Sequence, residues 1–306
     1  MSNETIIGGI SGKEIRVPDA NGPPMPELGP LGVLVNGEPA KDFGAIDSQR
    51  GYPDVLGFQR KLGLLLPATN TTMEPELWSI LCTNPGFDGI SLHTANVSTP
   101  RPQLHTAADL LEYKRQFLEG LTAAVDQILL AEPQYLIMGM SLEHILRGID
   151  EVRTPMAEVE TYAARAMATC HDATLAALER VGARRIGLLT PFDKLGNENA
   201  AQMYIDLGFD VVATAGFSCA NTLHIAHIPD WAKEKAIVEL LATSSNKLDA
   251  VVQCGTNMSL CRLSEKLEPE LGMPVLGINA VLLWYALREN GFTAPIERAG
   301  VLLREH

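Results

Sequence analysis

The sequence predicts an α/β fold of two similar lobes, each containing a doubly wound, mostly parallel sheet. Apolar runs of strand length alternate with helical stretches from residue 60 almost to the end of the chain. Two segment pairs also repeat. "LGLLLPATN" (62–70) is similar to "RIGLLTPFD" (185–193), and "QYLIMGMS" (134–141) is similar to "DAVVQCGT" (249–256). This repeat predicts a pseudo-two-fold relation between the lobes.

The first half of the repeat contains three predicted strands, each followed by a predicted helix. Pro67 breaks the apolar run of the first strand, and Gly139 ends that of the third. Gly182 closes the last helix, a common place for glycine. In chain order, the elements are a strand at 61–70, a helix at 72–83, a strand at 90–97, a helix at 106–131, a strand at 135–141 and a helix at 159–182.

The second half follows the same order. Its elements are a strand, turn and helix at 184–208, a strand at 209–217, a helix at 229–244, a strand at 248–257 that ends at Cys254, a helix at 260–272, a strand at 273–279 and a helix at 280–290. Strands that alternate with helices in this way pair in parallel.

Residues 1–60 differ from the rest, because ten glycines and seven prolines exclude long helices and central strands. We interpret them as an arm that wraps its own body or a neighbouring subunit of a homo-oligomer; a partly disordered tail is the alternative. A short hairpin is expected around Asn36-Gly37. The predicted domains are the arm at 1–60, a first lobe at 61–182 and a second lobe at 183–306, whose last elements can cross back to the first.

The bulk composition excludes several classes of partner. A formal charge of −13 argues against nucleic acid and anionic membranes, which need clustered Lys and Arg. No apolar run is long enough to span a bilayer, and the N-terminus does not resemble a signal peptide. Five cysteines without a CxxC motif predict a reduced, cytoplasmic protein without a zinc site. His224 and His227 lie three residues apart but have no evident acidic partner, so we expect no metal.

The predicted binding site lies where strand ends of the two lobes meet, because open α/β sheets bind ligands at the carboxyl ends of their strands. Gly139 and Cys254 are equivalent positions of the repeat, and we expect them to face each other across a cleft. Cys254 is otherwise a candidate for a packed core thiol. We expect Cys82, Cys170, Cys219 and Cys261 to be structural.

Four motifs resemble the aspartate/glutamate racemase superfamily, specifically its maleate isomerase and arylmalonate decarboxylase branch. "LGLLLPATNTTMEPE" resembles the opening of the isomerases, and "IMGMSLEHILRG" resembles a decarboxylase segment. "TPFDKLGN" resembles a shared Thr-Pro-Tyr turn, and "VVQCGTN" resembles the second cysteine motif of both. The resemblance extends over about residues 60 to 290 and leaves the first 60 outside.

The resemblance implies a cofactor-independent enzyme that acts on a small dicarboxylate. Racemases of the superfamily use two opposed thiols, whereas this chain has Gly139 at the first thiol position and keeps only Cys254. One thiol can protonate one face of a carbanion, as in the decarboxylases. The substrate-binding residues expected beside the catalytic Cys254 are Asn70, Thr71, Gly139, Met140, Ser141, Phe192, Asn197, Gly255 and Thr256. Among them, the backbone amides at 140, 141, 255 and 256, the hydroxyls at 71, 141 and 256 and the side-chain amide at 70 would supply donors to an enediolate.

Several of these positions remain open to other interpretations. Met140 and Phe192 replace a Thr and a Tyr of the family pattern, and each change removes a hydroxyl donor. Asn70 and Asn197 are also suited to capping helices. Glu143 and His144 stand where the decarboxylase pocket is more apolar, which favours a substrate with a polar group. His144 is suited either to a proton relay or to a solvated helix position.

The first functional hypothesis is decarboxylation of a substituted malonate-like diacid, with Cys254 as the proton donor. The second is cis–trans isomerisation of a maleate-like diacid, with Cys254 as the nucleophile. The third is a dicarboxylate-binding protein that has lost turnover.

Overall fold

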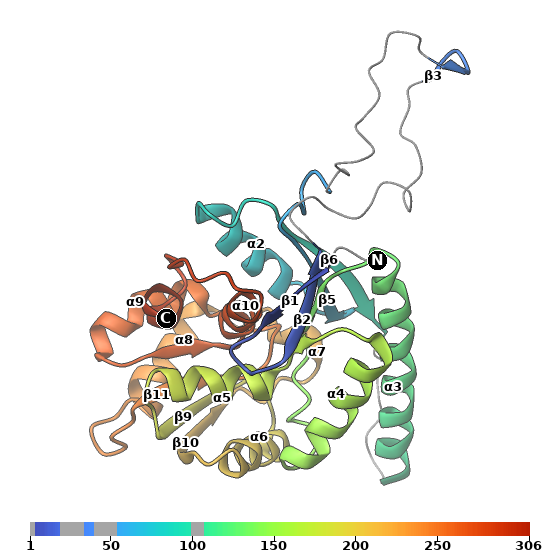
Figure 1. Cartoon of the computed structure of the whole chain (residues 1–306). Helices are drawn as coiled ribbons and strands as arrows, with labels where there is room; N and C mark the ends of the chain where they lie inside the picture. Colours follow the sequence, from blue (N-terminus) through green and yellow to red (C-terminus); the bar gives the residue numbers. More distant parts are fainter. Residues whose placement is uncertain (1–3, 19–33, 40–53, 99–106) are drawn as a thin grey trace.

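The computed structural model describes residues 4–18, 34–39, 54–98 and 107–306, and it contains two four-stranded parallel sheets (Figure 1). One sheet has the order β6-β5-β7-β8 and the other the order β10-β9-β11-β12. In both, the first strand in the chain lies between the second and the third, so the topology repeats. The predicted fold class is confirmed. The strands are β5 (Arg60–Pro67), β6 (Ile90–Val97), β7 (Tyr135–Met138), β8 (Met167–Ala168), β9 (Arg185–Thr190), β10 (Asp210–Gly216), β11 (Ala250–Gln253) and β12 (Val275–Gly277).

The helices surround these sheets, and equivalent helices follow equivalent strands: one connects β5 to β6 and another connects β9 to β10 (Figure 1). None of the helices in the described ranges has the length and apolar character needed to cross a bilayer. They are α2 (Met73–Thr83), α3 (Ala107–Leu129), α4 (Ile149–Ala163), α5 (Cys170–Arg180), α6 (Lys194–Asp206), α7 (Thr222–Ile225), α8 (Asp230–Lys235), a π-helical turn (Ala236–Leu241), α9 (Cys261–Leu271), α10 (Ile278–Glu289) and α11 (Val301–Glu305).

Helix α10 connects the two halves of the fold. Every one of its residues is buried, as expected for a helix that is apolar on most of its surface. It follows β12 of the second sheet but packs against α2, α5 and β7, which belong to the first half. The C-terminal part of the chain therefore crosses back, although the domain boundary at residue 182 stays a prediction.

The helix predicted at 159–182 is wrong as a single element. Helix α4 ends at Ala163, and Ala164 adopts a left-handed conformation (φ 48°). The short strand β8 then pairs with β7, and α5 begins after Thr169, whose hydroxyl accepts a hydrogen bond from the Asp172 amide. Pairing with the sheet outweighs the helix propensity of this alanine-rich segment.

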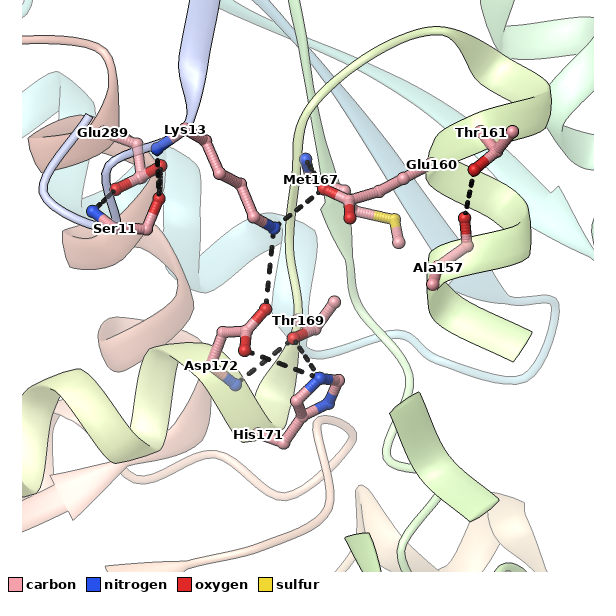
Figure 2. A network of polar contacts seen from close by, with 10 residues as sticks. All are labelled: Ser11, Lys13, Ala157, Glu160, Thr161, Met167, Thr169, His171, Asp172 and Glu289. Atoms are coloured by element: carbon pink, nitrogen blue, oxygen red, sulfur yellow. Dashed lines mark hydrogen bonds and ion pairs between the residues drawn. The ribbon is translucent and has the colours of Figure 1, made fainter. Parts of the chain in front are cut away.

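The described part of the N-terminal segment packs on the body of the protein. Strands β1 (Glu4–Gly8) and β2 (Glu14–Pro18) form a hairpin beside α10 and α5 (Figure 1). Its turn is held by Ser11, which donates two hydrogen bonds to Glu289, and by Lys13, which pairs with Glu160 at 2.9 Å and Asp172 at 3.7 Å (Figure 2).

The hairpin predicted around Asn36-Gly37 is confirmed. Strands β3 (Leu34–Val35) and β4 (Glu38–Pro39) form a hairpin, and Asn36 and Gly37 both have positive φ angles, 53° and 86°. Apart from the two hairpins, residues 1–53 lie outside the described part of the chain. Contact of this segment with a neighbouring subunit stays a prediction.

Candidate active site

A cavity of about 310 Å³ lies at the carboxyl ends of the strands of both sheets. Its walls come from the loops that follow β5, β7, β9, β10 and β11. Both halves of the fold therefore contribute to one site, at the place where open α/β sheets bind ligands.

Five of the ten predicted site residues line this cavity, and five do not. Those on its wall are Asn70, Ser141, Phe192, Gly255 and Thr256. Those away from it are Thr71, Gly139, Met140, Asn197 and Cys254.

The two halves contact each other directly at equivalent strand ends. The Gly139 amide donates to Leu65 O on β5 at 2.8 Å, and the Cys254 amide donates to Leu189 O on β9 at 2.9 Å. The Thr256 hydroxyl donates to Gly139 O at 2.8 Å, which joins one strand end to the other. Gly139 and Cys254 are thus equivalent, as the repeat predicted.

The prediction that Cys254 faces Gly139 across an open gap is wrong for this structure. The Cys254 side chain is fully buried, and its thiol donates to the Tyr204 hydroxyl on α6 at 3.6 Å. Burial, followed by the negative charge of Glu143, raises the pKa of the thiol far above its usual value. Cys254 is therefore a neutral thiol directly behind the cavity wall, of which the next residue, Gly255, is part.

The empty thiol position expected at Gly139 is filled by neighbouring side chains. A Cβ atom at Gly139 would lie 2.4 Å from Leu66 Cδ2, 2.8 Å from Met73 Sδ and 2.9 Å from the Leu65 carbonyl oxygen. Glycine is needed here for close packing. Met140 also points into the core, with 5% of its surface exposed, and provides no cavity wall.

The asparagines have structural roles that the sequence left open. Asn70 accepts hydrogen bonds from the Thr72 and Met73 amides at the start of α2, and its own amide group donates to Thr256 Oγ1 at 3.0 Å. It therefore holds the turn that leads into α2 and joins the two halves while it lines the cavity. The Thr71 amide is already bonded to Asn257 Oδ1.

Asn197 is neither a cap nor a cavity residue. Its side-chain oxygen accepts a hydrogen bond from the Thr190 hydroxyl, and it packs against Gly216. The cap of α6 is Asp193, which accepts from the Gly196 amide at 2.9 Å. Asn197 thus fixes the turn between β9 and α6.

Several wall residues were not predicted, among them Asn199, and the expectation of a purely structural role for Cys219 is wrong, because Cys219 also lines the cavity. Cys219 follows β10 in a segment without a recognisable motif, so only the tertiary fold reveals that its thiol lines the cavity. For His144 a proton relay or a solvated helix position was expected; the helix position is wrong, because His144 lies in a turn after β7 and lines the cavity. Its ring stacks on Phe192 with 4.7 Å between centroids, and burial lowers its pKa to about 4, so the imidazole is neutral at pH 7.

The cavity offers neutral hydrogen-bond donors to an anion. Among the described residues that line it there is no lysine or arginine, and Asp193 is the single carboxylate. Within the described chain, the backbone amides of Thr256 and Asn257 donate no hydrogen bond. Helices α2 and α6 begin at the cavity, and their N-termini favour negative charge. The described residues contain no cluster of three metal-ligating side chains.

The duplicated parallel sheets and the shared cavity at their strand ends define an enzyme of the aspartate/glutamate racemase type. The family model described as arylmalonate decarboxylase matches residues 131–303, more than half of the chain. This chain belongs to the arylmalonate decarboxylase family, in the branch that also contains the maleate isomerases, and it is an enzyme of that superfamily.

Known proteins of both activities are similar to it. Maleate isomerase of Nocardia farcinica is 27% identical over 255 residues, which cover 80% of this chain and 96% of that protein. A cysteine-to-serine variant of the Nocardia farcinica maleate cis-trans isomerase, with a covalently bound succinylcysteine intermediate, has a TM-score of 0.68 at 24% identity, covering 81% and 99% of the two chains. A liganded arylmalonate decarboxylase with one glycine-to-cysteine and one cysteine-to-serine change also has a TM-score of 0.68, at 15% identity, covering 81% and 100%.

Proposed function

We propose that this chain catalyses the cis–trans isomerisation of a maleate-like cis-dicarboxylate through Cys254. The observation that carries the proposal is the position of this thiol at the carboxyl end of β11, one residue before the cavity wall and two and three residues before the unpaired amides of Thr256 and Asn257. The similarity to a maleate isomerase over nearly its whole length supports the substrate class.

A single thiol is sufficient for this reaction. The sulfur adds to one alkene carbon, and the π electrons move into the carboxylate on the other carbon to form an enediolate. The former double bond is then single and can rotate. The electron pair returns, the C–S bond breaks, and the trans isomer leaves. Neutral donors placed in advance stabilise the enediolate, which is the charge that develops during the reaction.

Cys254 has to turn toward the cavity before it can react. In the resting structure its thiol points to Tyr204, and the Gly255 amide beside it donates to the Ser141 hydroxyl on the wall at 3.1 Å. Contacts of catalytic groups in ligand-free enzymes often become productive only in the substrate complex. A rotation of the cysteine side chain about its Cα–Cβ bond is the smallest movement that exposes the sulfur.

Decarboxylation of a substituted malonate is the second candidate. It is favoured by Gly139, because one of the two equivalent strand ends carries no thiol, and by the match to the decarboxylase family model. In this reaction the C–C bond electrons form an enediolate as CO2 leaves, and Cys254 donates its proton to the carbanion carbon.

Product analysis separates the two reactions. The full chain is incubated with maleate and with substituted malonates, and fumarate and CO2 are measured. Formation of fumarate supports isomerisation. Formation of CO2 without fumarate overturns isomerisation and supports decarboxylation, and binding without either product overturns both.

Two cysteine variants test the assignment of the thiol. Cys254→Ala should abolish turnover, whereas Cys219→Ala, a matched change of the thiol that already lines the cavity, should retain it. Loss of activity in Cys219→Ala but not in Cys254→Ala would overturn the assignment.

A further inference from the structure

A buried acidic residue lies directly beneath the cavity. Glu143 belongs to the loop after β7, has 1% of its surface exposed, and has one carboxylate oxygen, Oε2, without a hydrogen-bond partner. Ser141, which lines the cavity, lies two residues before Glu143, and its hydroxyl accepts a hydrogen bond from the Gly255 amide at 3.1 Å. The loop that carries Glu143 therefore contacts the residue next to Cys254.

Three other titratable groups lie near enough to Glu143 for its charge to act on them. They are Cys170 at the start of α5, Tyr204 on α6 and Cys254 after β11. The negative charge of Glu143 raises the pKa of each of them, after the larger effect of burial. A buried carboxylate without a cationic partner is costly, so this cluster has a strong tendency to take up a proton.

Burial accordingly raises the pKa of Glu143 to about 7, although hydrogen bonds from its own amide, from Ser141 and from Leu142 oppose the shift. Cys254 and Glu143 are thus both buried, and the charge of Glu143 acts on the thiol. A neutral thiol cannot act as a nucleophile until its proton has been accepted by another group.

We propose that Glu143 accepts the proton of Cys254 when this thiol reacts and returns it when the product leaves. The inference rests on the proposed role of Cys254 and acts through that residue. Glu143 accepts the thiol proton in the isomerisation, whereas in the decarboxylation it acts only in the second half, as the group that reprotonates the thiolate.

The proton and electron balance is complete in the isomerisation. The S–H bond breaks, its electron pair stays on sulfur to form the C–S bond, and the proton binds Glu143 Oε2. After elimination, the sulfur regains its pair and then its proton, and Glu143 is again ionised. In the decarboxylation, the thiol proton goes to carbon, and neutral Glu143 protonates the thiolate; a solvent proton then restores Glu143.

The test measures the alkylation of Cys254 by iodoacetamide between pH 5 and 9, with the Cys254 peptide quantified by mass spectrometry. The logarithm of the rate should rise with pH and level off near pH 7, because Glu143 is then ionised and its capacity to accept the thiol proton no longer increases. Glu143→Gln should lose this break and react more slowly near pH 7, with a rate that rises about tenfold for each pH unit because only thiolate formed by loss of the proton to solvent reacts. The exposed Glu158→Gln should keep the break.

Turnover should fall as well. Without a proton acceptor, Glu143→Gln should lose roughly 10²- to 10⁴-fold in kcat, the usual effect of a positioned acid–base group. A variant in which only the packing around Cys254 is weakened would be alkylated faster at every pH and would keep the break near pH 7.

The alkylation experiment needs no substrate, so it can fail independently of the proposed function. Absence of a break near pH 7 in the unmodified protein, its persistence in Glu143→Gln, or no alkylation of Cys254 at any pH would overturn the inference. A normal break together with no turnover of maleate or malonates would instead count against the proposed function alone.

Discussion

Introducing a thiol at Gly139 should destabilise the protein without creating a racemase. The perturbation is Gly139→Cys, the change that would complete a two-thiol site if the position faced the cavity. Its Cβ would lie 2.4 Å from Leu66 Cδ2, where carbon atoms ordinarily stay roughly 3.5 to 4 Å apart. The Leu66 and Met73 side chains can move, but the Leu65 carbonyl, 2.9 Å from the new Cβ, is held by its hydrogen bond to the Gly139 amide.

Overpacking of this kind costs about 1 to 3 kcal/mol, and a fixed carbonyl places the expected loss near the upper end, at about 3 kcal/mol. Urea unfolding measures it, with Gly8→Ala as a control of small effect, because a Cβ at Gly8 meets no atom within 4 Å. Racemisation is followed by deuterium exchange at the α-carbon of 2-substituted carboxylates. A Gly139→Cys variant with unchanged stability and new exchange activity would refute the assignment of this position to the core.

Two further predictions concern stability. Ser11→Ala removes the hydroxyl that donates to the fully buried Glu289, so it should lower the free energy of unfolding by about 2 kcal/mol, whereas the exposed Ser244→Ala should have little effect; equal effects would contradict the docking of the hairpin. His171 has a pKa lowered to about 4 by burial, so the unfolded chain binds the extra proton between pH 6.5 and 4, and stability should fall as pH falls through that range. His171→Asn should reduce this slope in pH-dependent unfolding and the exposed His93→Asn should not; a residual slope is expected from His144, whose pKa is also lowered to about 4, and an undiminished slope in His171→Asn would contradict the assignment.

The sequence predicted most of the regular structure because buried parallel strands and amphipathic helices have different periods. The strands at 61–70, 90–97 and 209–217 lie within two to three residues of β5, β6 and β10. The failure at 159–182 has a physical reason. The break between α4 and α5 contains neither Gly nor Pro, and β8 exists only because β7 is beside it. The local sign that was available is Thr169 followed by Asp172, a capping pattern.

The site was predictable in location but only partly in composition. Polar residues directly after strands, such as Asn70, Ser141 and Thr256, line the cavity because strand ends meet there. Cys219 could not be recognised, since its role depends on a loop that the tertiary fold brings to the wall. Asn197 and Thr71 lie beside wall residues in the sequence but are bonded to other parts of the protein.

The direction of the Cys254 side chain follows from the duplication itself. At the end of β7, a Cβ atom at Gly139 would contact Met73 on α2, the helix that follows β5. At the end of β11, the Cys254 thiol points to Tyr204 on α6, the helix that follows β9. Two positions that obey the same local geometry both point into their own halves, so equivalence in sequence does not by itself place them face to face. A reaction at Cys254 therefore requires the sulfur to leave the contact with Tyr204. Replacing that hydroxyl by Tyr204→Phe should make the turn easier, and faster alkylation of Cys254 at an unchanged pH break is the result this geometry demands.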